Sequence, residues 1–419
     1  MISMIPFNTM IYRLTMLVKP IGLFSLLLIL SVSVSRAQPS ILGPTIMDLT
    51  LLKQQKKSLD AGDKDLKFAY QQLIKWANKS LSFGPVSVME KKEIPPSGSK
   101  HDYMSLAPYH WPDPSKKDGL PYIRKDGETN PEVKLYKDKE YLPSLCEHLV
   151  LLSVAHHFSG KELYANHAMK LIRVWFLDSA TRMNPNMNFG QAIKGVNQGR
   201  GAGLIDGRNL IKAIEAISLL SANKAVSAKE QVALQQWFAE FLTWMQTSKI
   251  GQEELDAPNN HGAWYDALRL SIALYTQQFA HAKEIVTNAQ KRLTVQMDPS
   301  GRFPLEMART TSFHYSVFVV DAFLKIAAMS QHLGFDFWGF TAANGNSLPK
   351  AVDALLPYLN QQKAWDGPQI KPFNDQEAIP FLSIAASKFN HKGAADWLKS
   401  NTVSHSDNMF NYLLTLNDF

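Results

Sequence analysis

The sequence contains almost no cysteine. Its 419 residues include one, Cys146, so the chain cannot form an internal disulfide. Cys146 lies in LCEHL at 145–149, which is typical of a helix face, and a thiol in such a setting behaves as a small hydrophobic group. We interpret Cys146 as structural, because no neighbouring pattern supports the alternative of a nucleophilic cysteine.

Common catalytic and cofactor-binding signatures are also missing. The chain has no GxSxG, no GxxxxGK[ST], no HExxH and no EF-hand loop. Serine hydrolases, P-loop proteins and zinc proteases therefore lack their signatures here. We predict no cofactor and no catalytic metal, and leave open a structural calcium site built from scattered carboxylates.

Long apolar runs are missing after the first 37 residues, so we predict no stable membrane anchor. Residues 1–37 have the pattern of a signal peptide, with two basic residues before the apolar run 21–34 and small residues at Ser35 and Ala37. We predict cleavage after Ala37 and a periplasmic or secreted protein. An uncleaved N-terminal anchor is the alternative.

The charge is mildly basic. The full chain carries a formal net charge of +7, of which residues 1–37 contribute three positive charges and no acid, leaving +4. This excess suits a polyanionic ligand such as an acidic polysaccharide, although ordinary scatter in surface charge also explains it. Basic residues form no dense block, and we predict no nucleic-acid partner.

Apolar spacing is helical almost everywhere. Leu66, Tyr70, Leu73 and Ala77 recur at intervals of four, three and four residues. Long alternating strand patterns are scarce, and short breaks between consecutive helices indicate stacked helical hairpins in an all-α domain at 38–419. Further helices are predicted over 140–158, 161–177, 207–222, 228–247, 261–276, 279–296, 314–333, 349–359, 376–389 and 392–400.

Two long irregular stretches interrupt the helices, at 83–135 and 179–206. Both are rich in aromatic or polar residues and glycine rather than in low-complexity sequence. Long loops in a compact domain are usually functional or disordered, and this composition favours ordered segments over a cleft.

Four motifs stand out in these loops and helices. They are DYMSLAPYHWPDPS at 102–115, NPNMNFGQAIKGVNQGRG at 184–201, NNHGAWYD at 259–266 and PLEMARTTSFHYS at 304–316. In sequence and in order along the chain they resemble the alginate lyase superfamily, and within it polysaccharide lyase family 38. The resemblance implies an (α/α) toroid, an incomplete barrel of about six to seven helical hairpins, that cleaves uronate polymers.

The chemistry of uronate cleavage explains why these residue types are needed. Elimination removes the proton on C5, which is weakly acidic while the adjacent carboxylate is ionised, so donors must stabilise the charge that develops there. Asn260, His261 and Arg309 are suitable donors. One group then serves as base and acid when H5 and O4 lie on the same face, and Tyr315 is the candidate. The resemblance assigns these catalytic positions.

Other residues of the motifs are candidates for substrate binding. Aromatic residues can stack on sugar rings, and polar groups of the Gly-rich loop can contact a carboxylated sugar. For each of them a purely structural role is the alternative. The candidates are Tyr109, Trp111, Asn197, Gln198, Arg200, Trp264, Tyr265, Glu306 and His314.

The sequence leaves two rival functions open. An inverting glycoside hydrolase on a similar toroid would use two carboxylates, such as Asp206 and Glu306. A non-catalytic glycan-binding protein would keep the aromatic residues that stack on sugar rings but would not need Arg309 or Tyr315. The sequence does not show whether mannuronate or glucuronate is the preferred substrate. Guluronate is expected to be the poorer substrate. Whether the polymer is cleaved internally (endo) or from one end (exo) stays open. We expect a monomer.

Overall fold

The computed structural model describes residues 43–402, so the predicted signal peptide lies outside the described residues. Within this part of the chain all predicted helical stretches coincide with helices. The fourteen α-helices are α1 (Leu49–Asp60), α2 (Lys64–Ser80), α3 (Lys137–Ser159), α4 (Glu162–Ile172), α5 (Leu210–Ala222), α6 (Ala228–Thr247), α7 (Lys249–Leu255), α8 (Asn260–Tyr275), α9 (Phe279–Gln296), α10 (Pro304–Met307), α11 (Ser312–Ser330), α12 (Leu348–Leu355), α13 (Ile379–Phe389) and α14 (Lys392–Thr402).

Short helical turns extend or join these helices. Several account for the difference between predicted and observed boundaries, since the stretch predicted at 161–177 ends in a π-helix and the helix predicted from 207 is preceded by a 3-10 helix. They are η1 (Val88–Glu90), η2 (Pro131–Leu135), η3 (Arg173–Leu177, π), η4 (Gly201–Asn209), η5 (Gln331–Leu333), η6 (Leu356–Gln361) and η7 (Asp375–Ala378).

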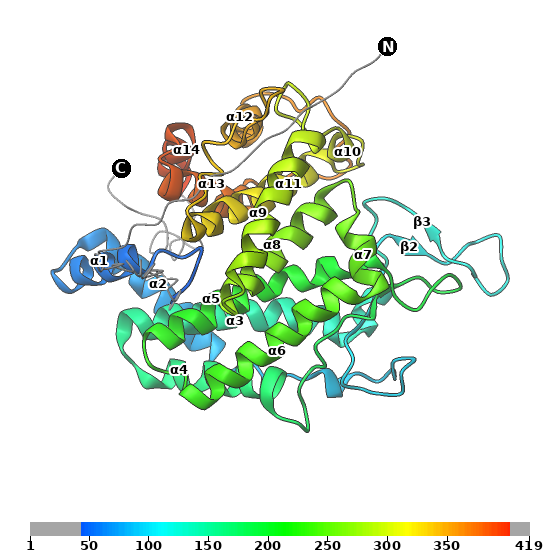
Figure 1. Cartoon of the computed structure of the whole chain (residues 1–419), viewed down its shortest axis with the longest axis horizontal. Coiled ribbons are helices and arrows are strands. Elements are labelled where there is room, and N and C mark those ends of the chain that lie inside the picture. Colours follow the sequence, from blue (N-terminus) through cyan, green and yellow to red (C-terminus); the bar gives the residue numbers. More distant parts are fainter. Residues whose placement is uncertain (1–42, 403–419) are drawn as a thin grey trace, which may run out of the picture. The chain divides into compact units, whose positions relative to one another are not determined.

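Five helices form an inner layer in which each contacts the next, in the order α3, α5, α8, α11, α13. Their sequences are apolar on most sides, as expected of helices enclosed by others. Every residue of α8 except His261 is buried. The layer is visible at the centre of Figure 1, where α8 and α11 lie beside α5 and α3.

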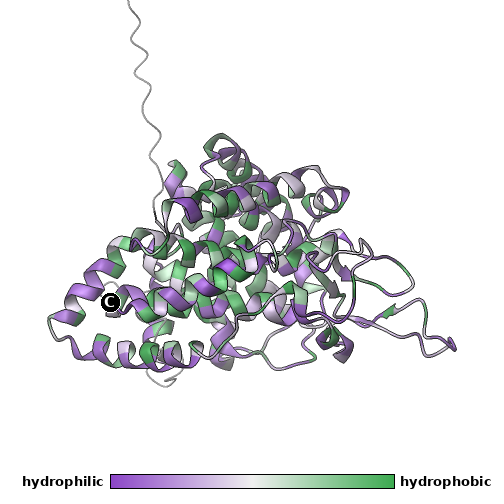
Figure 2. Ribbon diagram, turned by 90° about the horizontal axis from the view of Figure 1, so that it is seen from below, coloured by the Kyte–Doolittle hydropathy of each residue, from purple (hydrophilic) through white to green (hydrophobic). Residues whose placement is uncertain are grey.

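A second layer of amphipathic helices covers the first. Helix α4 packs on α3, α9 and α6 pack on α8, α12 packs on α11, and α14 packs on α13. Hydrophilic residues lie on the outer faces of these helices and on the projecting loops in Figure 2. The two layers form an (α/α) toroid, which confirms the predicted fold class. Twelve of the fourteen α-helices within residues 43–402 follow one another as six pairs, with the short helices α7 and α10 between pairs.

Local sequence signals explain several helix ends. Asp63 caps α2 by accepting from the backbone amides of residues 65 and 66, and Ser227 and Glu230 form a capping box at the start of α6. Helix α3 ends at Gly160, whose φ of +66° is readily adopted only by glycine.

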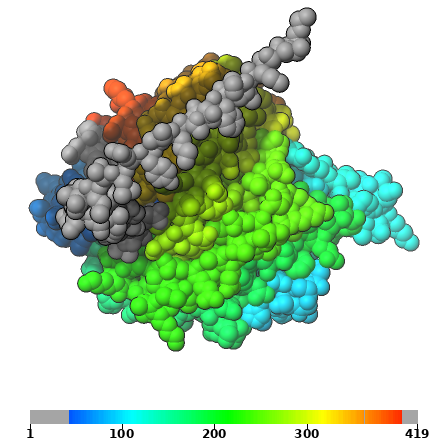
Figure 3. Space-filling model, in the orientation of Figure 1, coloured from blue at the N-terminus to red at the C-terminus, as the bar shows by residue number. Residues whose placement is uncertain are grey.

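The strands are short and hold the two long loops together. Strand β1 (Met104–Leu106) pairs in parallel with β4 (Phe189–Ala192), and β2 (His110–Trp111) pairs antiparallel with β3 (Ile123–Arg124). The loop segment around β2 and β3 projects beyond the helices as the cyan surface of Figure 3. The stretches 83–135 and 179–206 are therefore ordered neighbours, as their composition predicted.

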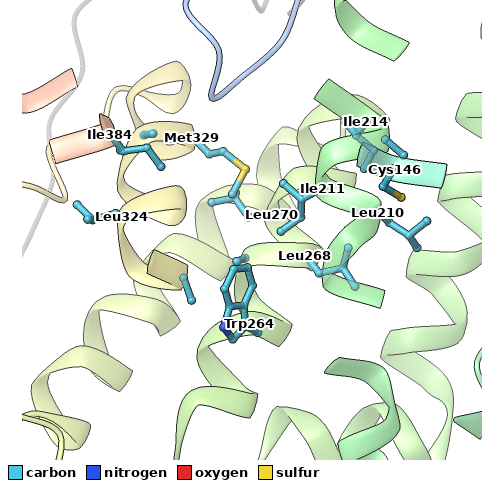
Figure 4. Close-up of a cluster of buried hydrophobic side chains, with 14 of the residues drawn as sticks. Cys146, Leu210, Ile211, Ile214, Trp264, Leu268, Leu270, Leu324, Met329 and Ile384 are labelled. Atoms are coloured by element: carbon cyan, nitrogen blue, oxygen red, sulfur yellow. The ribbon is translucent and has the colours of Figure 1, made fainter. Parts of the chain in front are cut away.

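Close packing of the inner helices accounts for two further features. The stretch Ser312–Leu333 is apolar and long enough to span a membrane, but 72% of its most apolar window is buried inside the fold, as in a core helix. Cys146 is fully buried among apolar side chains, as Figure 4 shows, and burial raises the pKa of its thiol to about 12. The structural interpretation of Cys146 agrees with this position.

Candidate active site

A cleft of about 970 Å³ lies where the amino-terminal ends of three inner helices meet the two long loops. Its wall includes residues just before or within the first turns of α5, α8 and α11. Unpaired amide groups and the helix dipole give this end of each helix a partial positive charge, which favours an anionic ligand. The cleft is therefore suited to an acidic substrate.

Helix α8 begins at this wall with Asn260. Asn259 is the N-cap, and its Oδ1 accepts from the backbone amide of His261. The carboxylate of buried Glu306 accepts from the backbone amide of Asn260 at 2.6 Å and from its Nδ2 at 2.8 Å. Burial raises the pKa of Glu306, and the hydrogen bonds from Asn260 oppose this effect. Glu306 thus fixes the Asn260 side chain at the wall.

His261 follows Asn260 and is oriented by an acid on α7. Its Nδ1 lies 2.7 Å from Oε1 of Glu254, a side chain with only 3% of its surface exposed. Since a carboxylate accepts a hydrogen bond, the shared proton resides between Nδ1 and Glu254, and Nε2 is the ring nitrogen that remains for the cleft. Asn260 and His261 thus present two oriented polar groups side by side.

Arg309 also lines the cleft and is held by a residue of the first long loop. Its Nε and Nη2 donate to both carboxylate oxygens of Asp126, at 3.0 Å and 2.7 Å for the shortest contacts. Asp126 also accepts from the backbone amide and hydroxyl of Thr310. Although burial acts to raise the pKa of Asp126, the hydrogen bonds from Arg309 and Arg124 lower it well below its ordinary value. Nη1 is the part of Arg309 that has no hydrogen bond to a described residue.

Tyr315 stands beside Arg309 on the first turn of α11. Its ring faces the guanidinium, and its hydroxyl donates to the hydroxyl of Tyr109 at 3.0 Å. Burial and the neighbouring Tyr109 raise the pKa of Tyr315 well above the ordinary value for tyrosine, while Arg309 acts in the opposite direction. The adjacent His314 also lines the cleft, and its Nδ1 contacts Nε2 of Gln369 at 2.7 Å.

Comparisons with known proteins agree with this arrangement. The model of the family described as alginate lyase matches residues 87–365. An alginate lyase from Bacteroides ovatus is 36% identical in sequence, covers 90% of this chain and 99% of its own, and superposes with a TM-score of 0.84. The chain belongs to the alginate lyase family.

More distant alginate lyases share the fold. Alginate lyase A1-III from Sphingomonas species A1 is 15% identical and superposes with a TM-score of 0.58, covering 91% of this chain and 98% of its own. A variant of A1-III complexed with a tetrasaccharide is 14% identical, with a TM-score of 0.59 and the same coverage.

Among curated proteins, no sequence match was found. The predicted superfamily is confirmed, and the chain is a polysaccharide lyase; assignment to family 38 stays a prediction.

The cleft of this alginate lyase family member brings together the predicted catalytic residues and some of the predicted binding residues. Asn260, His261, Arg309 and Tyr315 all line it, from two segments of the chain. The predicted binding residues that join them are Tyr109, Arg200 and His314.

Two predicted binding residues on α8 are placed elsewhere. Trp264 and Tyr265 are 4% and 3% exposed and belong to the core, where Trp264 packs on Phe318 and the hydroxyl of Tyr265 donates to the carbonyl of Met245. Figure 4 shows Trp264 among buried apolar side chains. The prediction that they bind substrate is wrong, because side chains pack around them in the interior of the toroid and leave no room for a sugar.

Four other predicted binding residues also do not line the cleft. Trp111 donates from Nε1 to the carbonyl of Glu128 within the loop, and Asn197 uses its Oδ1 to accept from the amide of Ile193. Gln198 is outside the cleft wall. Glu306 lies behind Asn260, with both carboxylate oxygens already accepting hydrogen bonds. None of these four side chains lines the cleft, and Glu306 acts on the site through Asn260.

Several residues of the site were not predicted. Asp126 and Glu254 orient Arg309 and His261, and Arg208, Lys139 and Lys371 line the cleft as cations. Arg208 lies a few residues after the NQGRG motif, and this position is the sequence feature that could have indicated it as a site residue. No sequence pattern indicated Asp126 or Glu254 as site residues, because their roles depend on contacts between distant or irregular segments.

Proposed function

We propose that this protein cleaves 4-linked uronate polymers, such as the polymannuronate of alginate or glucuronan, by β-elimination. The convergence of Tyr315 with Asn260 and His261 in one cleft is the observation that supports this most. It brings a single acid–base group and a pair of oriented polar groups to the same cleft, as the elimination requires.

Asn260 and His261 are proposed to receive the carboxylate of the reacting uronate. Glu306 holds the Asn260 amide and Glu254 holds the His261 ring, so neither side chain needs to reorganise when charge develops on the carboxylate. Arg309 contributes through Nη1 and through its charge, which the ion pair with Asp126 partly compensates.

Tyr315 is proposed to act first as base and then as acid. Its hydroxyl donates to the Tyr109 hydroxyl, and before reaction the phenolic proton passes to solvent through that hydroxyl, which leaves Tyr315 as the phenolate. The deprotonated oxygen takes the C5 proton, the C4–O4 bond breaks as the C4–C5 double bond forms, and the same proton passes to O4 of the leaving sugar. A tyrosine with a raised pKa is a strong base once deprotonated, and it holds the proton until O4 of the leaving sugar accepts it.

The glycoside hydrolase alternative receives no support from the carboxylates. Glu306 accepts two hydrogen bonds from Asn260 behind the cleft wall, and Asp206 is paired with Lys139. A pair of carboxyl groups flanking one glycosidic bond would need an acid and a base that both face the substrate. The residues that line the cleft fit the roles required by the lyase reaction better than those required by a hydrolase.

The test is to incubate the protein without residues 1–37 with polymannuronate, polyguluronate and glucuronan while recording ultraviolet absorbance. A rising signal from the conjugated unsaturated uronate is expected. New reducing ends without that signal would favour hydrolysis, and neither signal with any uronate polymer would contradict the proposal.

Export is proposed from the sequence of residues 1–37 alone. Expression of the full chain in a Gram-negative host, followed by mass spectrometry of the periplasmic protein, is expected to show an amino terminus at Gln38. A full-length cytoplasmic product would contradict this part of the proposal.

A further inference from the structure

A group of charged side chains surrounds the part of the cleft between η4 and α11. It contains two acids, and each is already paired with its own lysine, Asp206 with Lys139 and Asp321 with Lys325. The fifth member, Arg208, forms an ion pair with no described residue. The group therefore holds three cations and two anions, and one positive charge is unmatched.

Arg208 is nevertheless largely enclosed. Its Nη1 donates to the carbonyl of Ile205 at 2.9 Å, and its guanidinium lies 5.2 Å from the centroid of the Phe318 ring. Burial lowers the pKa of Arg208, while Asp206, Tyr103 and Asp321 oppose this effect. An enclosed charge without an ionic partner is costly for a folded protein, so its retention at a cleft wall indicates a ligand that supplies the partner.

The other arginines of the cleft are less available. Arg309 has a bidentate carboxylate partner in Asp126, and Arg124 contacts the same carboxylate. Arg200 donates to the carbonyl and side-chain oxygens of Gln191. Arg208 has one backbone hydrogen bond and four donors of its planar fork unassigned among the described residues, which suits a carboxylate.

We propose that Arg208 binds a carboxylate of the uronate polymer inside the cleft. The proposal rests on the proposed function for the class of ligand, and it adds a binding residue next to the reacting bond. Tyr315 and Arg208 line the same cleft, and the two side chains interact electrostatically. The bound carboxylate therefore belongs to a sugar at or beside the one from which Tyr315 removes the proton.

The experiment measures binding separately from turnover. A saturated mannuronate tetrasaccharide is titrated by calorimetry into protein carrying Tyr315→Phe, with and without Arg208→Met. Loss of a bidentate, charge-assisted contact is expected to weaken binding by about 10- to 100-fold. Arg208→Lys is expected to recover part of the affinity, because it keeps the charge but not the planar fork.

Two controls identify the carboxylate as the group that is bound. A tetrasaccharide whose carboxylates are reduced to alcohols is expected to bind equally to the proteins with and without Arg208→Met, since the contact is missing in both. Arg173→Met removes an arginine that pairs with Glu230 away from the cleft, and it is expected to leave affinity unchanged.

Thermal unfolding distinguishes binding from a structural role. Removing an unmatched enclosed charge is expected to leave the melting temperature of the ligand-free protein unchanged or higher, and to reduce the increase caused by the tetrasaccharide. Equal affinity with and without Arg208→Met would overturn the proposal, as would a failure of the tetrasaccharide to bind the Tyr315→Phe parent. Binding through Arg208 is measured on the Tyr315→Phe protein, which is expected not to cleave the tetrasaccharide. The proposed function is tested separately, by measuring turnover of the unaltered protein.

Discussion

The guanidinium carbon of Arg309 lies 3.6 Å from the centroid of the Tyr315 ring. The same long loop supports this stack from both sides, because Asp126 holds Arg309 and Tyr109 accepts the Tyr315 hydroxyl hydrogen bond. A cation over the face of an aromatic ring stabilises the stack and favours negative charge on the phenolic oxygen. The position and the acidity of Tyr315 therefore both depend on loop residues 109 to 126.

Tyr315→Phe is expected to lower kcat by at least about 100-fold, because it removes the single group assigned to both proton transfers. The ring still packs under Arg309, so tetrasaccharide affinity is expected to change little. Initial rates from ultraviolet absorbance and calorimetric titration measure the two effects. Near-normal turnover in the folded variant would refute the role of Tyr315.

Tyr265→Phe is the matched control, since it removes a tyrosine hydroxyl of the same protein outside the cleft. The hydroxyl donates to the carbonyl of Met245 in the core, so the variant is expected to lose about 1 kcal/mol of stability and to keep its kcat. Urea unfolding and initial rates check this. A large loss of turnover would restore Tyr265 as a binding residue.

Asp126→Asn is expected to lower kcat by about tenfold or more, because Arg309 loses its charged partner and its fixed position over Tyr315. It also changes the acid stability. The pKa of Asp126 in the folded protein lies below its unfolded value, so its contribution is complete above the unfolded pKa and is lost as the pH falls through the folded pKa.

Urea midpoints between about pH 6 and pH 2 measure that contribution. Stability of the parent protein is expected to fall more steeply over this interval than stability of Asp126→Asn, with the two curves closest at the acidic end. Parallel curves would show that Asp126 is not stabilised by Arg309 in solution.

Glu306→Gln is expected to reduce kcat/KM by about 10- to 100-fold, because one of the two oxygens that accept from Asn260 becomes an NH2 group, which cannot accept. The surface substitution Glu284→Gln is the control for removing one negative charge, and it is expected to have no effect. Steady-state rates on polymannuronate provide the measurement. Equal rates for the two variants would mean that Glu306 does not position Asn260.

Polymannuronate is expected to be cleaved faster than polyguluronate. In mannuronate H5 and O4 lie on the same face of the sugar, within reach of one hydroxyl, whereas guluronate needs a base and an acid on opposite faces. Tyr315 is the single group assigned to both proton transfers, while His261, whose Nδ1 contacts Glu254, is assigned to the carboxylate. Initial rates on the two block polymers decide this, and a preference for polyguluronate would contradict a single-tyrosine mechanism.

The inner layer of the fold could be predicted because its helices are long and strongly apolar. Helices α1, α7 and α10 were not predicted, and each is short or rich in polar residues. Helix α7 has seven residues, KIGQEEL, and α1 is rich in lysine and glutamine. Such segments become helical through their neighbours, which a local pattern does not reveal.

The catalytic positions were predictable because they lie in motifs, but their partners were not. Asp126 and Arg309 are far apart in the sequence, and only folding brings the loop to α11. The error at Trp264 and Tyr265 has a geometric cause. They lie about one helical turn after His261, and that turn carries them from the cleft into the packed interior of the toroid.

The burial of Cys146 has a practical consequence for following the enzyme at work. Because it is the only cysteine of the chain and none of its surface is exposed, maleimide dyes and spin labels have no native target on the folded protein. A cysteine introduced at the exposed loop residue Lys117 would then carry a single probe. Distance and fluorescence measurements on polymer binding are thus open to this protein without first replacing a native residue.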